Sequence, residues 1–238
     1  MQEQKDIYIY NYKNIREYNN LIENINHNLT QEGEINGDYL VSYINSYLLE
    51  PNKFTAFVHC WSKIFLRSFI IDNKVKFNEN LDQLEDVNFN FKLLIKNPKI
   101  FYSNKNPFYE YYIRKESSNL SKQSGDNPSV KIKQTIRALM AVKNYLLSLK
   151  ENQNKVSKKI RHLYATTFIL WVFRIVKNSK NLHKAIKDVK IYCFSEIVQR
   201  SLRDYIFQKN NSYIIPILIK LKTPFWIILT VNFKEKFK

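Results

Sequence analysis

An adjacent pair of carboxylates, Glu85 and Asp86, is the feature of this sequence best suited to chemistry. Asp82 precedes Glu85 by three residues and stands just before apolar positions of helical spacing, which predicts an Asp82 N-cap with Glu85 as its capping partner. Asp86 would then lie in the first helical turn, where the helix dipole favours an ionised carboxylate. An ionised carboxylate can act as a general base toward a hydroxyl group, although an acidic pair at a helix start also has a purely structural interpretation.

A second group of candidates surrounds Trp61, with His59 two residues before it and Lys63 two residues after it. Aromatic and aliphatic residues recur at helical spacing from Phe57 to Phe69, which predicts a helix over residues 57–71. Core packing explains most of these apolar positions, and Trp61 is the one we expect to serve a ligand. His59 can hydrogen-bond an acceptor or a diphosphate, but a lone histidine is more often simply a partly buried side chain.

The elements that must position these residues change in kind along the chain. Strands are predicted over residues 6–12, 99–103 and 108–112, the last two on either side of a Pro107 turn, and a helix is predicted over Gly37–Leu49. Polar and breaker residues at 117–128 then mark a boundary. Beyond it the pattern predicts helices over residues 130–149, 156–177 and 182–208, followed by an apolar tail. The fold class is therefore mixed α/β over residues 1–122, followed by an all-α basic region over residues 123–238.

In this order, the segments resemble the second half of a family 2 glycosyltransferase of the GT-A type. The resemblance rests on Trp-Ser-Lys at 61–63, Phe-Asn-Glu at 77–79, Glu85-Asp86, and a Tyr-rich segment that ends in Arg114 and Ser117. It implies that Asp86 is the catalytic base with Glu85 beside it, and that Trp61, Lys63 and His59 line the site of a glycan acceptor. It also implies that Arg114 lies near the diphosphate of a nucleotide-sugar and stabilises the leaving group.

The sequence departs from the family pattern on the donor side. The family binds its nucleotide-sugar through an N-terminal βαβ half and an Asp-x-Asp motif that holds Mn²⁺ or Mg²⁺, and no Asp-x-Asp occurs in these 238 residues. We therefore expect an acceptor half that is incomplete alone, with no metal site of its own. Nucleotide-sugar and metal would bind only when the other half is supplied.

Charge is distributed very unevenly between the two regions. Residues 1–126 contain 15 Lys and Arg against 16 Asp and Glu, whereas residues 127–238 contain 23 against 5. This excess favours an anionic partner for the helical region, either the cytoplasmic leaflet of a membrane or nucleic acid. The basic residues are mostly Lys and match no motif that reads bases, so nucleic acid is the less favoured partner.

The remaining composition bears on localisation. The two cysteines, Cys60 and Cys193, have no metal-binding spacing and fit a reducing compartment, and the N-terminus lacks the plan of a signal peptide. The longest charge-free stretches of the helical region are shorter than the roughly 17–25 residues of a membrane-spanning helix. The tail from Tyr213 combines aliphatic residues with Trp226, Lys220 and Lys222, which suits either packing on the other helices or lying in a membrane interface.

Together these observations predict a cytoplasmic protein, either free or peripheral on the inner face of the membrane. It would belong to an inverting glycosyltransferase that acts on a cell-surface glycan. The alternative is a non-enzymatic basic helical module that binds an anionic membrane surface or nucleic acid.

Overall fold

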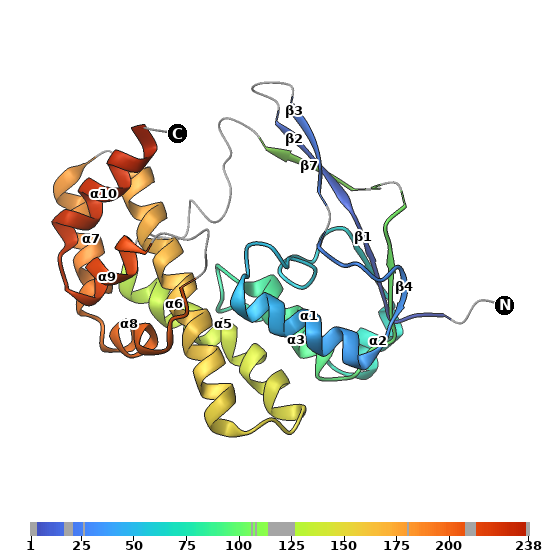
Figure 1. Ribbon diagram of the computed structural model, residues 1–238. Coiled ribbons are helices and arrows are strands. Elements are labelled where there is room, and N and C mark those ends of the chain that lie inside the picture. The colour runs from blue at the N-terminus through green and yellow to red at the C-terminus, as the bar shows by residue number, and fades with distance from the viewer. Residues whose placement is uncertain are drawn as a thin grey trace.

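The computed structural model describes residues 4–16, 21–25, 27–105, 107, 109–113, 127–179, 181–207 and 213–236. Two small sheets and three helices form a mixed α/β region, and a set of longer helices follows it in the sequence and lies beside it (Figure 1). The expected fold class, α/β followed by an all-α region, is confirmed.

The first sheet has the strand order β4-β6-β1-β5. Its strands are β1 (Ile7–Tyr10), β4 (Gly33–Ile35), β5 (Lys63–Phe65) and β6 (Ile100–Ser103). β1 pairs in parallel with β6 and antiparallel with β5. Ile7, Ile9, Ile100 and Tyr102 are buried on its inner face, because alternate side chains of a strand point to the same side.

The second sheet continues the parallel pair at the centre of the first. β2 (Tyr12–Arg16) follows β1 after one residue and pairs in parallel with β7 (Tyr109–Ile113), the strand that comes after β6. β3 (Leu21–Ile25) pairs antiparallel with β2 on its other side. The segment predicted as one strand over residues 6–12 is therefore shared between two sheets, and β2 and β7 extend beyond the first sheet toward the upper edge of the molecule in Figure 1.

The helix predicted over residues 57–71 is wrong. Turns occupy residues 57–62, β5 follows, and only α2 (Arg67–Asp72) is helical. The cause lies at Ser62, which has a left-handed backbone (φ 62°) and is buried. Its hydroxyl donates to the carbonyl oxygens of Tyr10, at 2.7 Å, and Asn11, at 3.1 Å, and so turns the chain into position to pair with β1.

The helix predicted at Gly37–Leu49 is present as α1, and α3 spans Glu85–Leu94. The predicted cap of α3 is wrong, because the residue before the helix is Leu84, with φ 58° and no side-chain capping bond. Asp82 instead accepts a hydrogen bond from Gln134 Nε2 at 2.8 Å. Glu85 and Asp86 both stand in the first turn of α3, where Asp86 was expected.

The helical region begins with two long helices, α5 (Pro128–Ser148) and α6 (Gln153–Asn178). The single helix predicted over 182–208 is divided into α7 (Leu182–Phe194), α8 (Glu196–Ser201) and a 3-10 turn at Leu202–Asp204. The division falls at Ser195, which has extended backbone angles. There Gln199 Nε2 donates a hydrogen bond to the carbonyl oxygen of Cys193 at 2.7 Å. α9 (Ile214–Lys220) and α10 (Pro224–Lys236) form the tail.

Two hydrophobic cores hold these elements together. One is shared by the α/β helices and by α5 with the first half of α6, where Tyr145 packs edge-on against Phe91 of α3 at 5.7 Å between ring centroids. The other is formed by the second half of α6 with α7 to α10. The predicted domain division at residues 122 and 123 stays a prediction. Among the residues described, no helix is both long and apolar enough to cross a membrane.

Candidate functional site

The candidate site lies where the turns at residues 57–62 meet the first turns of α3. Asp86 Oδ2 accepts a hydrogen bond from the backbone N–H of Cys60 at 2.9 Å. One helical turn later on the same face, Asn90 Nδ2 donates to the carbonyl oxygens of Phe57, at 3.1 Å, and His59, at 3.0 Å. Two side chains of α3 thus fix the position of this loop, and the loop in turn orients the carboxylate of Asp86.

Lys63 brings a positive charge to the same place. Its ammonium donates to the carbonyl oxygen of His59 at 2.5 Å and interacts electrostatically with Asp86. Burial lowers the pKa of Lys63 to about 8, while Cys60 and Asp86 act against that shift. The charged form of a poorly solvated ammonium is stabilised by any further anion that approaches it.

His59 is half-buried and lies within electrostatic reach of both charged groups. Burial, and then the nearby Lys63, lower its pKa to about 4, and Asp86 opposes this. The imidazole is therefore neutral near pH 7 and can both donate and accept a hydrogen bond. Burial also raises the pKa of the Cys60 thiol, which makes it a poor nucleophile.

Aromatic rings form a stack centred on Trp61. His59 stacks on the Trp61 ring at 4.5 Å between centroids, Tyr111 stacks at 5.1 Å and Tyr109 at 5.3 Å, and Tyr12 meets it edge-on at 4.3 Å. Trp61 thus lies at the centre of a cluster of four aromatic rings, three of them stacked on it and one edge-on.

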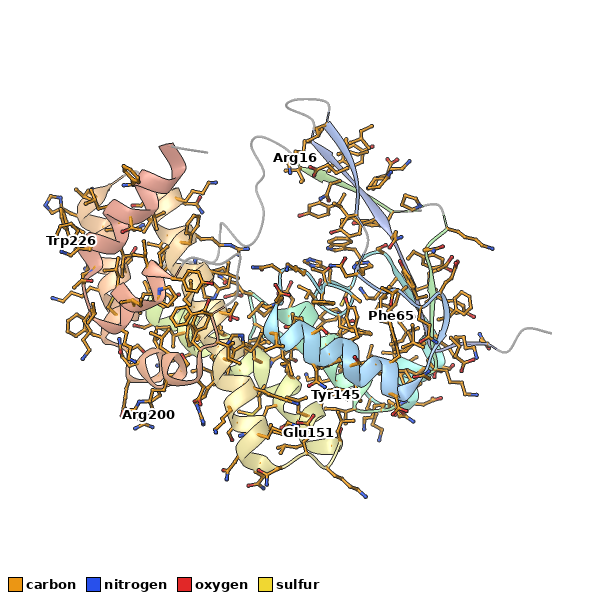
Figure 2. All side chains as sticks on the ribbon, viewed as in Figure 1. Arg16, Phe65, Tyr145, Glu151, Arg200 and Trp226 are labelled. Carbon is orange, nitrogen blue, oxygen red and sulfur yellow. The ribbon has the colours of Figure 1, made fainter. Side chains whose placement is uncertain are left out.

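The two tyrosines reach Trp61 because of strand geometry. Tyr109 and Tyr111 are two residues apart on β7 and so project to the same side of the second sheet. Figure 2 shows the long side chains of this sheet, including Arg16 at its far end, standing apart from the densely packed side chains around Phe65 between the first sheet and the helices. The stack therefore joins the second sheet to the loop that binds Asp86.

Glu85 is half-buried at the first position of α3. Burial raises the pKa of its carboxyl, with Asp86 and Asp82 adding to the shift and a hydrogen bond with its own backbone acting against it. A carboxyl whose pKa is raised by burial is less readily ionised, which suits Glu85 to supporting the site more than to acting as its base.

The structure therefore brings together five of the six predicted residues: Asp86, Glu85, Lys63, His59 and Trp61. The sixth, Arg114, lies outside the described residues. Within the described ranges, no three His, Cys, Asp or Glu side chains are grouped so as to hold a metal ion. The part of the chain that the structure describes therefore offers no ligand set for the metal that the resemblance implies, and no step of the chemistry below passes through it.

Sequence reasoning missed Asn90 and the tyrosines of the stack. Asn90 follows Asp86 by four residues, a spacing that places both on one helix face once the helix start is known. The spacing of two between Tyr109 and Tyr111 gave a similar signal within the predicted strand. The contact of these tyrosines with Trp61 could not be predicted from spacing, because Trp61 belongs to a loop that the sequence predicted as helix.

Comparison with known proteins bears on the fold of the chain. No protein-family model and no curated protein matches the sequence. Among solved structures, the chain is similar to S. aureus TarS 1-349 in complex with UDP-GlcNAc, with a TM-score of 0.56 and 13% sequence identity. The match covers 98% of this chain and 60% of that chain, so the present chain spans less than two thirds of its neighbour. TarS is a GT-A-like glycosyltransferase, and the chain described here has a glycosyltransferase-like fold.

Proposed function

We propose that this chain is the acceptor-binding, base-carrying part of an inverting, family 2-like glycosyltransferase. The transferase moves a sugar from a nucleotide-sugar to a cell-surface glycan at the cytoplasmic face of the membrane. Asp86 is the general base, Glu85 supports it, and the stack around Trp61 with His59 and Lys63 borders the acceptor. The observation that carries the proposal is the placement of Asp86, which the Cys60 N–H orients beside a neutral imidazole and a buried ammonium.

The proposed reaction is a single displacement. A hydroxyl oxygen of the acceptor attacks the anomeric carbon of the donor sugar, and the bond from that carbon to the diphosphate oxygen breaks. Asp86 takes the hydroxyl proton, and the nucleoside diphosphate leaves with the electron pair of the broken bond. Attack from the face opposite the leaving group inverts the anomeric centre. Positive charge from Lys63, and from Arg114 as the resemblance implies, would offset the charge that develops on the diphosphate.

Donor binding is assigned to residues outside this chain. The sequence has no Asp-x-Asp motif, and the fold neighbour whose structure contains UDP-GlcNAc is longer than the present chain. We propose that a donor half supplies both the nucleotide-sugar site and the Mn²⁺ or Mg²⁺ that would neutralise the diphosphate. The present chain alone is then expected not to bind nucleotide-sugars.

The test starts from the DNA before the Met1 codon, translated in three frames. If it encodes an Asp-x-Asp half, that half is produced joined to this chain, and release of nucleoside diphosphate is measured over a panel of nucleotide-sugars and glycans. Asp86→Asn is expected to lower the rate at least about 100-fold, since it removes a general base and leaves a side chain of the same shape. Asp82→Asn is the matched control, because Asp82 binds Gln134 on α5, and it should keep the rate within about twofold.

Two outcomes would contradict the proposal in different ways. Turnover of a nucleotide-sugar by the 238-residue chain alone would refute the assignment of donor binding to another half. An Asp86→Asn enzyme with wild-type rate would refute the role of Asp86. The alternative function, a non-enzymatic basic module, predicts no transfer by any combination of this chain with a donor half.

A further inference from the structure

Large apolar side chains are exposed along the outer side of the C-terminal tail. Between 47% and 64% of each is accessible to solvent, and Leu221, in the turn between α9 and α10, is among the most exposed. We call this set the tail face; it consists of Ile214, Ile217, Leu221, Phe225, Trp226, Leu229 and Phe233. Large apolar side chains that are exposed together along one segment in this way mark an interaction site.

The opposite sides of the same two helices are apolar as well. Ile215, Ile219, Ile227, Ile228 and Val231 are buried in the second hydrophobic core. α9 and α10 thus carry apolar side chains toward the protein and also away from it. A helix that is apolar all round is normally covered on all sides, so the core accounts for only half of this pattern. The tail face calls for a second apolar environment.

In the sequence from residue 205 to residue 234 every charged side chain is positive, and Glu235 follows directly. This stretch contains Lys209, Lys220, Lys222 and Lys234 and no Asp or Glu. Lys220 and Lys222 are exposed on either side of Leu221. The ammonium groups of Lys222 and Lys190 also lie over the exposed ring of Phe194, at 5.2 Å and 5.8 Å from its centroid. The tail face therefore combines apolar side chains with positive charge. It is complementary to a partner surface that has negative groups on the outside and hydrocarbon beneath them.

The position of the tail leaves this face open to a large flat partner. α9 and α10 lie at the side of the molecule away from both sheets in Figure 1, and Figure 2 places Trp226 at that outer edge. Phe225 and Trp226 contact each other edge-on at 5.9 Å and present two aromatic rings together. Aromatic rings, aliphatic side chains and flanking lysines are the side chains that anchor helices at the boundary between lipid headgroups and acyl chains.

From these observations we infer that the tail face binds the surface of an anionic lipid bilayer, with α9 and α10 lying in the headgroup region. The inference is independent of sugar transfer, because it uses none of the residues of the candidate site. It would place a protein with a glycosyltransferase-like fold on a membrane through its last two helices.

The test is co-sedimentation of the full chain with vesicles. Vesicles of phosphatidylcholine with a quarter phosphatidylglycerol are expected to bind the chain and pure phosphatidylcholine vesicles to bind it at least about fivefold less, since each Lys near an anionic surface strengthens binding by about that factor. Trp226 provides a direct signal: acyl chains brominated near the headgroup should quench the fluorescence of the wild type more than that of Trp226→Phe, which keeps the face apolar.

Matched variants distinguish binding through the tail face from non-specific hydrophobic binding and from non-specific electrostatic attraction. Phe225→Ser/Trp226→Ser/Leu229→Ser is expected to lower vesicle binding at least about tenfold, because three exposed apolar side chains that would enter the bilayer surface are lost. The control Ile71→Ser/Val130→Ser/Met140→Ser removes apolar side chains that are exposed on other helices and should bind within about twofold of wild type. Likewise, Lys220→Glu/Lys222→Glu should lose binding, while Lys155→Glu/Lys158→Glu, at exposed positions on α6, should lose clearly less.

Circular dichroism of each variant establishes that it is folded before binding is compared. The inference is overturned if the wild type binds neither vesicle, or if the triple-serine variant binds like wild type. It is also overturned if light scattering shows that the wild type is a dimer which the triple-serine variant cannot form and vesicles do not displace, since a second copy would then cover the tail face.

Discussion

At the residue scale, the chain places a carboxylate and an ammonium close together at one loop. Asp86 and Lys63 interact electrostatically across a half-buried loop, and each is also bound to the backbone of that loop, Asp86 to the Cys60 N–H and Lys63 to the His59 carbonyl. The loop is thereby fixed by charged groups. Such an arrangement costs stability, because burial disfavours the charged form of the ammonium.

That cost can be measured as a pH dependence of stability. The pKa of Lys63 is about 8 in the folded chain and 10.5 when unperturbed, so between these values the unfolded state binds more protons and stability rises with pH. Below pH 8 the folded state bears the full penalty. Lys63→Met should remove this rise, so that the free energy of unfolding of wild type increases relative to that of the variant between pH 7 and pH 9.5, whatever the gap between the two at pH 7. Urea unfolding from pH 7 to 9.5 measures the gap.

Exposed Lys105→Met is the control for removing an ammonium as such. A gap between wild type and Lys63→Met that stays constant over this pH range would mean that Lys63 pays no penalty on burial. The electrostatic description of the site would then be wrong.

How far these residues could be predicted depends on how local their signals are. The acidic pair was found because adjacent carboxylates near a helix start are visible in a few residues. The relation of Asp86 to Cys60 joins segments 26 residues apart and depends on the left-handed turn at Ser62, for which the sequence has no glycine as a marker. The sequence identified the chemistry of the site, and long-range packing determined its geometry.

At the element scale, the shortage of glycine changes how helices end. Asn97, Lys150 and Lys222 adopt left-handed backbones (φ 51° to 58°) just after α3, α5 and α9, positions where glycine is usual. The helix limits near 49 and 149 were predicted from apolar spacing alone. The break at Ser195 was missed because apolar residues of helical spacing continue through it. The side chain of Gln199 binds the Cys193 carbonyl oxygen at this break and also donates to Ile219 O at 2.9 Å.

This shortage leads to a prediction at the end of α5. Lys150 is exposed, has φ 58° and donates its backbone N–H to Leu147 O at 3.0 Å. Lys150→Gly should raise the free energy of unfolding by about 0.5–1 kcal/mol, since a left-handed backbone is unfavourable for a residue with a Cβ. Urea unfolding measures this. Lys133→Gly, at an exposed position inside the same helix, is the matched control and should lower it by a similar amount. Equal losses at both positions would contradict the explanation.

At the scale of the whole molecule, His162 of α6 connects three parts of the chain. Its Nε2 donates to the carbonyl oxygen of Leu49, the last residue of α1, at 3.3 Å, and its Nδ1 accepts the N–H of Ile206 at 3.0 Å. Tyr205 stacks on the ring at 5.3 Å. The same imidazole thus fixes the α/β region and the segment after α8 to one point of α6, and it does so only in its neutral form, because protonated Nδ1 cannot accept.

Acid should therefore loosen the junction between the two regions. Burial lowers the pKa of His162 below its unperturbed 6.5, so at lower pH the unfolded state binds the proton first and stability falls as the pH drops through 6.5. His162→Gln cannot titrate. Its free energy of unfolding should be lower than that of wild type by about 1–3 kcal/mol at pH 7.5, the cost of disturbing buried hydrogen bonds, and the difference should shrink by pH 5.

His183→Gln, at an exposed position on α7, is the matched control for losing an imidazole. Urea unfolding at both pH values measures the difference, and hydrogen exchange at Ile206 reports whether the bond to His162 opens first. A difference that stays the same from pH 7.5 to 5 would mean that the neutral imidazole does not join these regions.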